Sequence, residues 1–286
     1  MNRGPQISLN GNSFWDASLA HDLEFCERQR IPALSVPVRK VEAAGPEQAV
    51  EQMAASGTEI VSVIVPGIFD LRDESVWPSQ RERLEEMVDV AAAAGAASVY
   101  TTTGPAGSMG WEQAAAALQR ALPPAAAHAE RRGVRLLVEP TSPVYAHLSF
   151  VHTLADVAEL SRLTGIGIVV DAIAVYGERG LGETIRALAG EIELVQVCDH
   201  APGPRSATNP GGLSADNRAV PGDGEIPLAE LLGLILDGGY AGYLDLEIFG
   251  PRIAAEGEAA AVGRGIEWIR RFLWDRSEAR GGQNGG

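Results

Sequence analysis

Four side chains that carry oxygen stand at or near the ends of short apolar runs in the second half of the chain. They are Glu139 in LLVEP, Asp171 in IVVDA, Gln196 in LVQVCD and Glu247 in LDLEIF. Each acid taken alone is equally well explained as the first polar residue of a strand that emerges into solvent. Brought together, three carboxylates repel one another and raise their own pKa values, so they need a cation to stay ionised. The set therefore predicts a site for one divalent metal ion.

The ligand types indicate which metal this site prefers. Three carboxylates and one amide oxygen form an all-oxygen set, which suits Mn²⁺ or Mg²⁺ better than Zn²⁺. We expect Mn²⁺ first, with Mg²⁺ or Co²⁺ as alternatives. Gln196 would turn its carbonyl oxygen to the ion and its NH₂ to a carboxylate or a substrate hydroxyl. The alternative is a glutamine that backbone groups and water satisfy inside the fold.

Eight runs rich in β-forming residues alternate with longer segments of helical composition, which is typical of βα units around a parallel sheet. The expected strands are QISLN from Gln6, ALSVPV from Ala33, EIVSVIV from Glu59, ASVYTTT from Ala97, VRLLVEP from Val134, GIGIVVD from Gly165, ELVQVCD from Glu193 and GYLDLEIF from Gly242. Eight such units predict an α/β fold, a single (β/α)8 TIM barrel. Catalytic groups of such barrels come from the C-terminal ends of the strands, where the four residues stand.

The helices are expected between these strands, at residues 17–29, 46–55, 79–94, 111–132, 154–163, 182–188, 228–237 and 256–274. Thr153 suits the N-cap of the fifth of them, with Asp156 in its first turn. Residues 201–227 are the longest irregular stretch and predict a loop over one mouth. We expect a single barrel domain over residues 1–278 and a disordered, Gly-rich tail over residues 279–286.

Composition excludes several classes of function. The chain has 286 residues, 45% of them hydrophobic and 21% charged, with a net charge of −15. This acidity argues against binding to nucleic acid or to an anionic membrane, so a small-molecule partner is expected. The two cysteines, Cys26 and Cys198, do not suggest a disulfide framework, and no apolar run is long enough to cross a bilayer. We expect a cytoplasmic protein, with a homodimer or a homotetramer as the open alternatives for its assembly.

The pieces VEP at Glu139, VVDA at Asp171, LVQVCD, and RAVPGDGEIPLAELLGLILDGGYAGYLDLEIFG resemble, in order and spacing, the xylose isomerase-like TIM barrels. This superfamily of sugar phosphate isomerases and epimerases also includes 3-dehydroshikimate dehydratases and inosose dehydratases. The resemblance covers nearly the whole chain. It implies that Glu139, Asp171, the residue on the seventh strand and Glu247 hold the metal, and that the two glutamates double as acid and base.

Gln196 departs from the commoner pattern, since many members of the superfamily carry histidine there. A group of the 3-dehydroshikimate dehydratases is similar to this chain in having glutamine, and LEIF resembles that group as well. That group tends to have a histidine shortly after the sixth-strand aspartate, whereas AIAVY follows Asp171 here. The endonuclease branch of the superfamily is disfavoured, because its zinc site draws on many histidines.

The reaction we expect is proton abstraction next to a carbonyl by Glu139 or Glu247, through an enediolate, in a sugar or keto-sugar. Return of the proton makes the enzyme a metal-dependent isomerase or epimerase. Loss of a β-hydroxyl makes it a dehydratase of a keto-polyol or a 3-dehydroshikimate-like acid, which is the alternative. A barrel that binds a sugar without catalysis is a third interpretation.

Four residues near the expected mouth are candidates for binding the substrate: His200, Arg218, Arg252 and Trp111. An arginine there would hold an anionic or hydroxylated group with two hydrogen bonds. The alternatives are solvated surface arginines, a loop histidine without a catalytic role and an aromatic ring that packs in the core.

Overall fold

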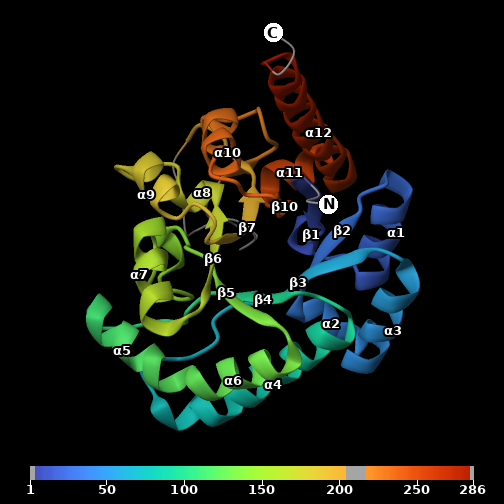
Figure 1. Cartoon of the computed structure of the whole chain (residues 1–286). Coiled ribbons are helices and arrows are strands. Elements are labelled where there is room, and N and C mark those ends of the chain that lie inside the picture. Colours follow the sequence, from blue (N-terminus) through green and yellow to red (C-terminus); the bar gives the residue numbers. More distant parts are fainter. Residues whose placement is uncertain (1–3, 204–216, 284–286) are drawn as a thin grey trace.

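The computed structural model describes residues 4–203 and 217–283. Eight parallel strands close into a barrel in the order β1, β10, β7, β6, β5, β4, β3, β2, as the sequence predicts, and helices surround them (Figure 1). The strands are β1 (Gln6–Asn10), β2 (Ala33–Pro37), β3 (Glu59–Val65), β4 (Ser98–Thr101), β5 (Arg135–Val138), β6 (Gly167–Asp171), β7 (Ile192–Val197) and β10 (Tyr243–Leu246). In the described part of the chain, no helix combines the length and apolarity that a membrane crossing requires.

The helices follow the expected alternation, with some additional short ones. They are α1 (Leu19–Gln29), α2 (Val38–Ala44), α3 (Pro46–Ser56), α4 (Trp77–Ala93), α5 (Trp111–Ala121), α6 (Pro123–Arg132), α7 (Leu154–Thr164), α8 (Ala172–Val175), α9 (Leu181–Ala187), α10 (Leu228–Asp237), α11 (Pro251–Glu256) and α12 (Glu258–Gln283). The single helix expected over 111–132 is two, because Pro123 lacks the N–H that would continue α5 and begins α6 instead. Gly257, with a φ of 96°, separates α11 from α12.

The tail predicted from residue 279 begins too early. Helix α12 continues through Gln283 and extends away from the barrel (Figure 1), so residues 279–283 are helical. Once a helix exists, each added residue gains a backbone hydrogen bond, and Glu278 and Ala279 favour the helix. Residues 284–286 of that predicted tail lie outside the described residues.

Side chains that point into the barrel form two layers below the mouth. The apolar layer is a small cluster of seven buried residues, Ala33, Val61, Ile64, Tyr100, Leu137, Val169 and Leu194. Asp245 of β10 is buried in a polar layer, where Ser8, Asn10 and Ser35 all donate hydrogen bonds to its carboxylate at 2.6–3.0 Å. Burial raises the pKa of Asp245 to about 6 despite these bonds.

One acid, Asp199, binds the backbone that follows β9 (Arg218–Ala219). The two ends of the segment after β7 pair as the antiparallel strands β8 (Asp199–His200) and β9, while residues 204–216 lie outside the described part. The Asp199 carboxylate accepts hydrogen bonds at 2.9–3.0 Å from the backbone N–H groups of Gly222, Gly224 and Ile226. A Cβ on Gly224 would lie 2.2 Å from this carboxylate, so only glycine allows the approach. This anchoring places β9 beside the barrel mouth.

The predicted N-cap of α7 is confirmed, and the carboxylate of Glu178 also accepts a hydrogen bond at this end of the helix. Thr153 accepts a hydrogen bond from the Asp156 N–H at 3.0 Å, and the Glu178 carboxylate accepts one from the Leu154 N–H. Burial nevertheless raises the pKa of Glu178 from its usual 4.5 to about 7. The folded protein therefore holds a proton on Glu178 more tightly than the unfolded chain does.

This raised pKa predicts a pH-dependent loss of stability. Between pH 4.5 and 7 the folded state binds more protons than the unfolded state, so the Glu178 contribution falls as pH rises and is absent above pH 7. Glu178→Gln keeps an oxygen for the helix cap and should raise the free energy of unfolding at pH 8 by about 1 to 3 kcal/mol. Urea unfolding at pH 4.5 and pH 8 measures this. An equal effect at both pH values would contradict it.

Candidate active site

The four predicted ligands all lie at the C-terminal mouth of the barrel, on neighbouring strands. Strand pairing sets Gln196 of β7 beside Asp171, the last residue of β6, and beside Asp245 on the other side. Glu139 and Glu247 follow β5 and β10, and their backbone N–H groups continue the sheet to Thr101 and Val197 at 3.0 Å.

Gln196 is fully buried, and its amide has a defined orientation. Its Nε2 donates to the hydroxyl of Tyr100 at 3.1 Å and to Glu247 Oε2 at 3.3 Å. Asn10 Nδ2 also donates to the Tyr100 hydroxyl, at 2.7 Å, so two hydrogen bonds fix the position of the phenol oxygen. The Gln196 side chain further forms a hydrogen bond with Glu139. Because the amide nitrogen is engaged, the carbonyl oxygen Oε1 is left buried without a hydrogen-bond partner among the described residues.

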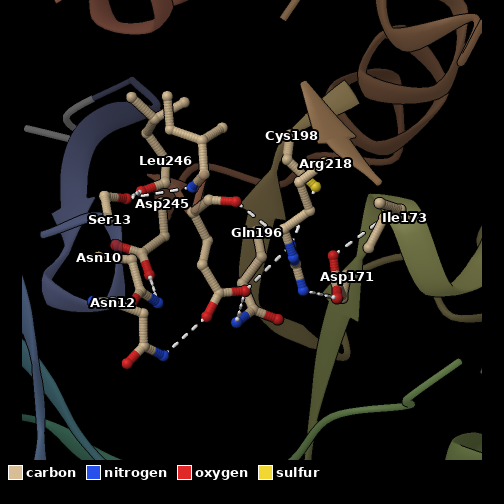
Figure 2. A network of polar contacts seen from close by, with 12 residues as sticks. Asn10, Asn12, Ser13, Asp171, Ile173, Gln196, Cys198, Arg218, Asp245 and Leu246 are labelled. Atoms are coloured by element: carbon tan, nitrogen blue, oxygen red, sulfur yellow. Dashed lines mark hydrogen bonds and ion pairs between the residues drawn. The ribbon is translucent and has the colours of Figure 1, made fainter. Parts of the chain in front are cut away.

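Arg218 of β9 brings a positive charge between two of the acids. Its Nη2 lies 3.3 Å from Asp171 Oδ2 and its Nη1 lies 3.2 Å from Glu247 Oε2, and all three side chains are about 6% exposed. Figure 2 shows the guanidinium between Gln196 and Asp171, with a further contact to Cys198. The ring of Phe249 lies 4.8 Å from the guanidinium carbon and limits its movement.

The acids of this cluster are not fully compensated. Burial raises the pKa of Glu139 well above its usual range, and the negative charges of Glu247 and Asp171 raise it further. The hydrogen bond from Gln196 and the charge of Arg218 lower the pKa only in part. With all three carboxylates ionised, one guanidinium leaves two negative charges unpaired, the number that a divalent cation would neutralise.

The cluster opens into a cavity of about 400 Å³. Glu139, Asp171, Arg218 and Glu247 line it, together with apolar surface from Ile64 and Phe249. A larger hollow of about 730 Å³ lies near the N-terminal ends of β5 and β6, but the acids do not reach it. A concave, mostly apolar space with converging polar groups is the usual form of a small-molecule site, so the smaller cavity is the candidate active site.

The comparison with protein families settles which family this is. Residues 19–272 match the model of the xylose isomerase-like TIM barrel. The chain belongs to that family.

The proteins to which this chain is similar are named for different activities. A putative hydroxypyruvate isomerase of Streptomyces coelicolor is 34% identical over 132 residues, which are 43% of this chain and 42% of that protein. A 3-dehydroshikimate dehydratase of Pseudomonas putida is 32% identical over 159 residues, 54% of this chain and 23% of that protein. The chain thus spans less than half the length of either relative. The solved structure of an L-ribulose 3-epimerase superimposes with a TM-score of 0.73 at 18% identity, covering 99% of this chain and 98% of that one.

The donor groups of this xylose isomerase-like barrel fit a divalent cation in type and charge. The unpartnered Gln196 oxygen and the three carboxylates supply the oxygen ligands that Mn²⁺ and Mg²⁺ prefer. Within residues 4–203 and 217–283, no three His, Cys, Asp or Glu side chains come close enough to hold a metal by themselves. Arg218 lies between Asp171 and Glu247. A metal ion bound by both acids would therefore have to lie beside the guanidinium or displace it.

Three of the predicted substrate residues are not brought to the cavity lining, whereas Arg218 is. Trp111 is half-buried at the start of α5 and packs edge-on against Phe150. His200 is buried, with its Nδ1 3.3 Å from the Tyr176 hydroxyl. Arg252 is exposed on α11. We therefore leave these three out of the proposed site.

Two residues of this family member's site escape the sequence analysis. Tyr100 lies inside β4, and its hydroxyl accepts a hydrogen bond from Gln196 at 3.1 Å. Asn12 donates from its Nδ2 to Glu247 Oε1 at 2.9 Å (Figure 2). Asn12 follows the first strand, where barrel sites collect their residues, so its position was the available signal. Nothing in ASVYTTT distinguishes Tyr100 from an ordinary core tyrosine.

Proposed function

We propose that this barrel is a divalent-metal-dependent isomerase or epimerase that acts on a sugar or keto-sugar. The observation that carries the proposal is the contact set around Gln196: its amide contacts Glu247 and Glu139, while its carbonyl oxygen has no hydrogen-bond partner among the described residues. Two glutamates near one amide, at the floor of a cavity, provide an acid and a base on different sides of a small ligand.

Glu139, Asp171, Gln196 and Glu247 would hold the metal, with Mn²⁺ preferred. The bound cation would withdraw electrons from the carbonyl and the adjacent hydroxyl oxygen of the substrate, which makes the neighbouring C–H more acidic.

The protein's own groups then move the proton. We assign the base to Glu247, because contacts with Asn12, Gln196 and Arg218 hold its carboxylate in one orientation at the cavity. Glu139, whose pKa is raised, is suited to return a proton to the opposite face of the enediolate. Arg218 is placed to bind a hydroxyl or carbonyl oxygen of the substrate beside its two acid partners, Asp171 and Glu247.

Dehydration is the second candidate, because one relative is a 3-dehydroshikimate dehydratase that matches over 159 residues. The same base would remove the proton next to the carbonyl, and the intermediate would expel a β-hydroxyl instead of taking the proton back. An enone or aromatic product absorbs in the ultraviolet, so formation of such a product from a β-hydroxy ketone separates the two reactions.

Removal of metal tests the proposal directly. We expect EDTA to abolish exchange of the substrate's α-proton with deuterated water, and Mn²⁺ to restore it more fully than Mg²⁺ or Zn²⁺. Nuclear magnetic resonance of hydroxypyruvate and of ketoses follows the exchange. Circular dichroism of the EDTA-treated protein controls for unfolding. Exchange that proceeds equally with and without metal would rule the proposal out.

A further inference from the structure

The cavity contains a second arginine that the proposed proton transfer does not use. Arg39 is the second residue of α2, directly after β2, and lines the same cavity as Glu247 and Arg218. It is half-buried, so its charge is partly removed from solvent. Desolvation is the main influence on this guanidinium and lowers its pKa, as expected for a cation held away from water.

Neutral groups hold Arg39 in one orientation. Its Nη1 donates to Asn12 Oδ1 at 2.5 Å and its Nη2 donates to the Trp15 carbonyl oxygen at 3.1 Å. Its guanidinium carbon lies 4.2 Å from the centroid of the Trp15 ring, so the group stacks on the indole. A guanidinium has five N–H donors in a planar fork, and these contacts use two of them. The remaining donors suit a planar or tetrahedral oxyanion.

No carboxylate of the described residues pairs with Arg39. The nearby acid with the largest influence on its pKa is Asp22, which is itself bound to the buried Lys40. Glu247 is connected to Arg39 only through the Asn12 amide. Arg218 differs in this respect, because it contacts two acids. Arg39 thus contributes to the cavity a positive charge that no direct ion pair among the described residues neutralises.

We propose that Arg39 binds an anionic group of the substrate, a carboxylate or a phosphate, at the end of the ligand away from the reacting carbon. The inference rests on the proposed function. Because a single amide bridges them, Arg39 Nη1 and Glu247 Oε1 lie no more than roughly 8 Å apart. The anionic group therefore lies only a few bonds from the proton that is removed. A cavity of about 400 Å³ accommodates a small hydroxyketone of this kind.

Three small hydroxyketones with different terminal groups test the assignment. Hydroxypyruvate carries a carboxylate, dihydroxyacetone phosphate carries a phosphate, and dihydroxyacetone is neutral. Titration calorimetry of the full chain with Mn²⁺ should give at least about tenfold tighter binding for one of the two anions than for dihydroxyacetone. The anion that binds more tightly identifies the group. Arg39→Gln should bring its affinity down to that of dihydroxyacetone and leave dihydroxyacetone itself unchanged.

Two further variants control the experiment. Arg83→Gln removes an exposed guanidinium of α4 that pairs with Glu42 of α2, the helix that also carries Arg39. This variant should change none of the three affinities. Arg39→Lys keeps the positive charge but loses the planar, forked arrangement of N–H donors, so we expect a preference for the anion over dihydroxyacetone that is smaller than in the unmodified protein. This variant replaces Arg39→Gln in the test if Arg39→Gln does not fold. Equal weakening of all three ligands by Arg39→Gln, or no preference for either anion in the unmodified protein, including no measurable binding, overturns the inference.

The readout here is an affinity and not a rate, which separates this inference from the proposed reaction. A protein that exchanges protons without metal but loses its anion preference with Arg39→Gln disproves only the metal-dependent reaction. A protein that needs metal but shows no anion preference disproves only the role of Arg39.

Discussion

Glu247→Gln is expected to lower kcat/KM for proton exchange by about 10³-fold, within the range lost when a general base is removed. The reason is the position of this carboxylate at the centre of the cluster, in contact with Asn12, Gln196 and Arg218. Glutamine has nearly the same shape, so the loss measures the chemistry of the carboxylate. Steady-state kinetics with the substrate identified by the exchange experiment provides the number.

The matched control is Glu112→Gln, which makes the same change at an exposed position on α5 and should leave kcat/KM unaltered. Ligand binding by Glu247→Gln also tests the interpretation that this barrel binds a sugar without catalysis. If neither the unmodified protein nor the variant turns over any hydroxyketone, while both bind it equally, that interpretation replaces ours.

Arg218→Met is expected to lower the free energy of unfolding by about 3 kcal/mol in the presence of EDTA. Removing one partner of a buried ion pair leaves an uncompensated charge, and here two buried carboxylates, Asp171 and Glu247, lose the same partner. A cation that binds these acids supplies the missing charge, so Mn²⁺ should recover part of the stability by binding only the folded state. Urea unfolding with EDTA and with Mn²⁺ measures both effects.

Arg252→Met serves as the comparison, since it removes an exposed arginine from α11 near the same end of the barrel. It should change the free energy of unfolding by no more than about 0.5 kcal/mol, with or without metal. A loss of stability in Arg218→Met that Mn²⁺ does not reduce would mean that the two acids do not bind the metal together.

The strands and most helices were predictable because their signals are local. Apolar β-forming runs such as EIVSVIV and GIGIVVD, separated by helical segments that stop at glycine, require only the neighbouring residues to be recognised. The prediction of eight strands also placed Glu139, Asp171 and Glu247 at the mouth, since the C-terminal ends of the strands in a parallel barrel lie on one side. Errors occurred where a single residue decided the outcome, as Pro123 and Gly257 did for the helices.

The partners of each side chain were not predictable from spacing. His200 and Arg218 both lie in the segment that follows the seventh strand, yet the β8 and β9 pairing turns Arg218 to the acids and buries His200 against Tyr176. Arg39 comes from helix α2 and Tyr100 from strand β4, and both are distant in sequence from the acids and the glutamine at the same site.

The sequence by itself determined the barrel and which strand ends carry acids, because hydrophobic periodicity and strand order act along the chain. Only the tertiary structure decided that Gln196 donates its N–H groups to Tyr100 and Glu247 and that its oxygen has no partner among the described residues. The tertiary structure also decided that Arg218 pairs with acids, whereas no acid of the described part of the chain pairs with Arg39. These properties depend on which groups exclude water from one another and how near their charges lie, and closure of the barrel sets both.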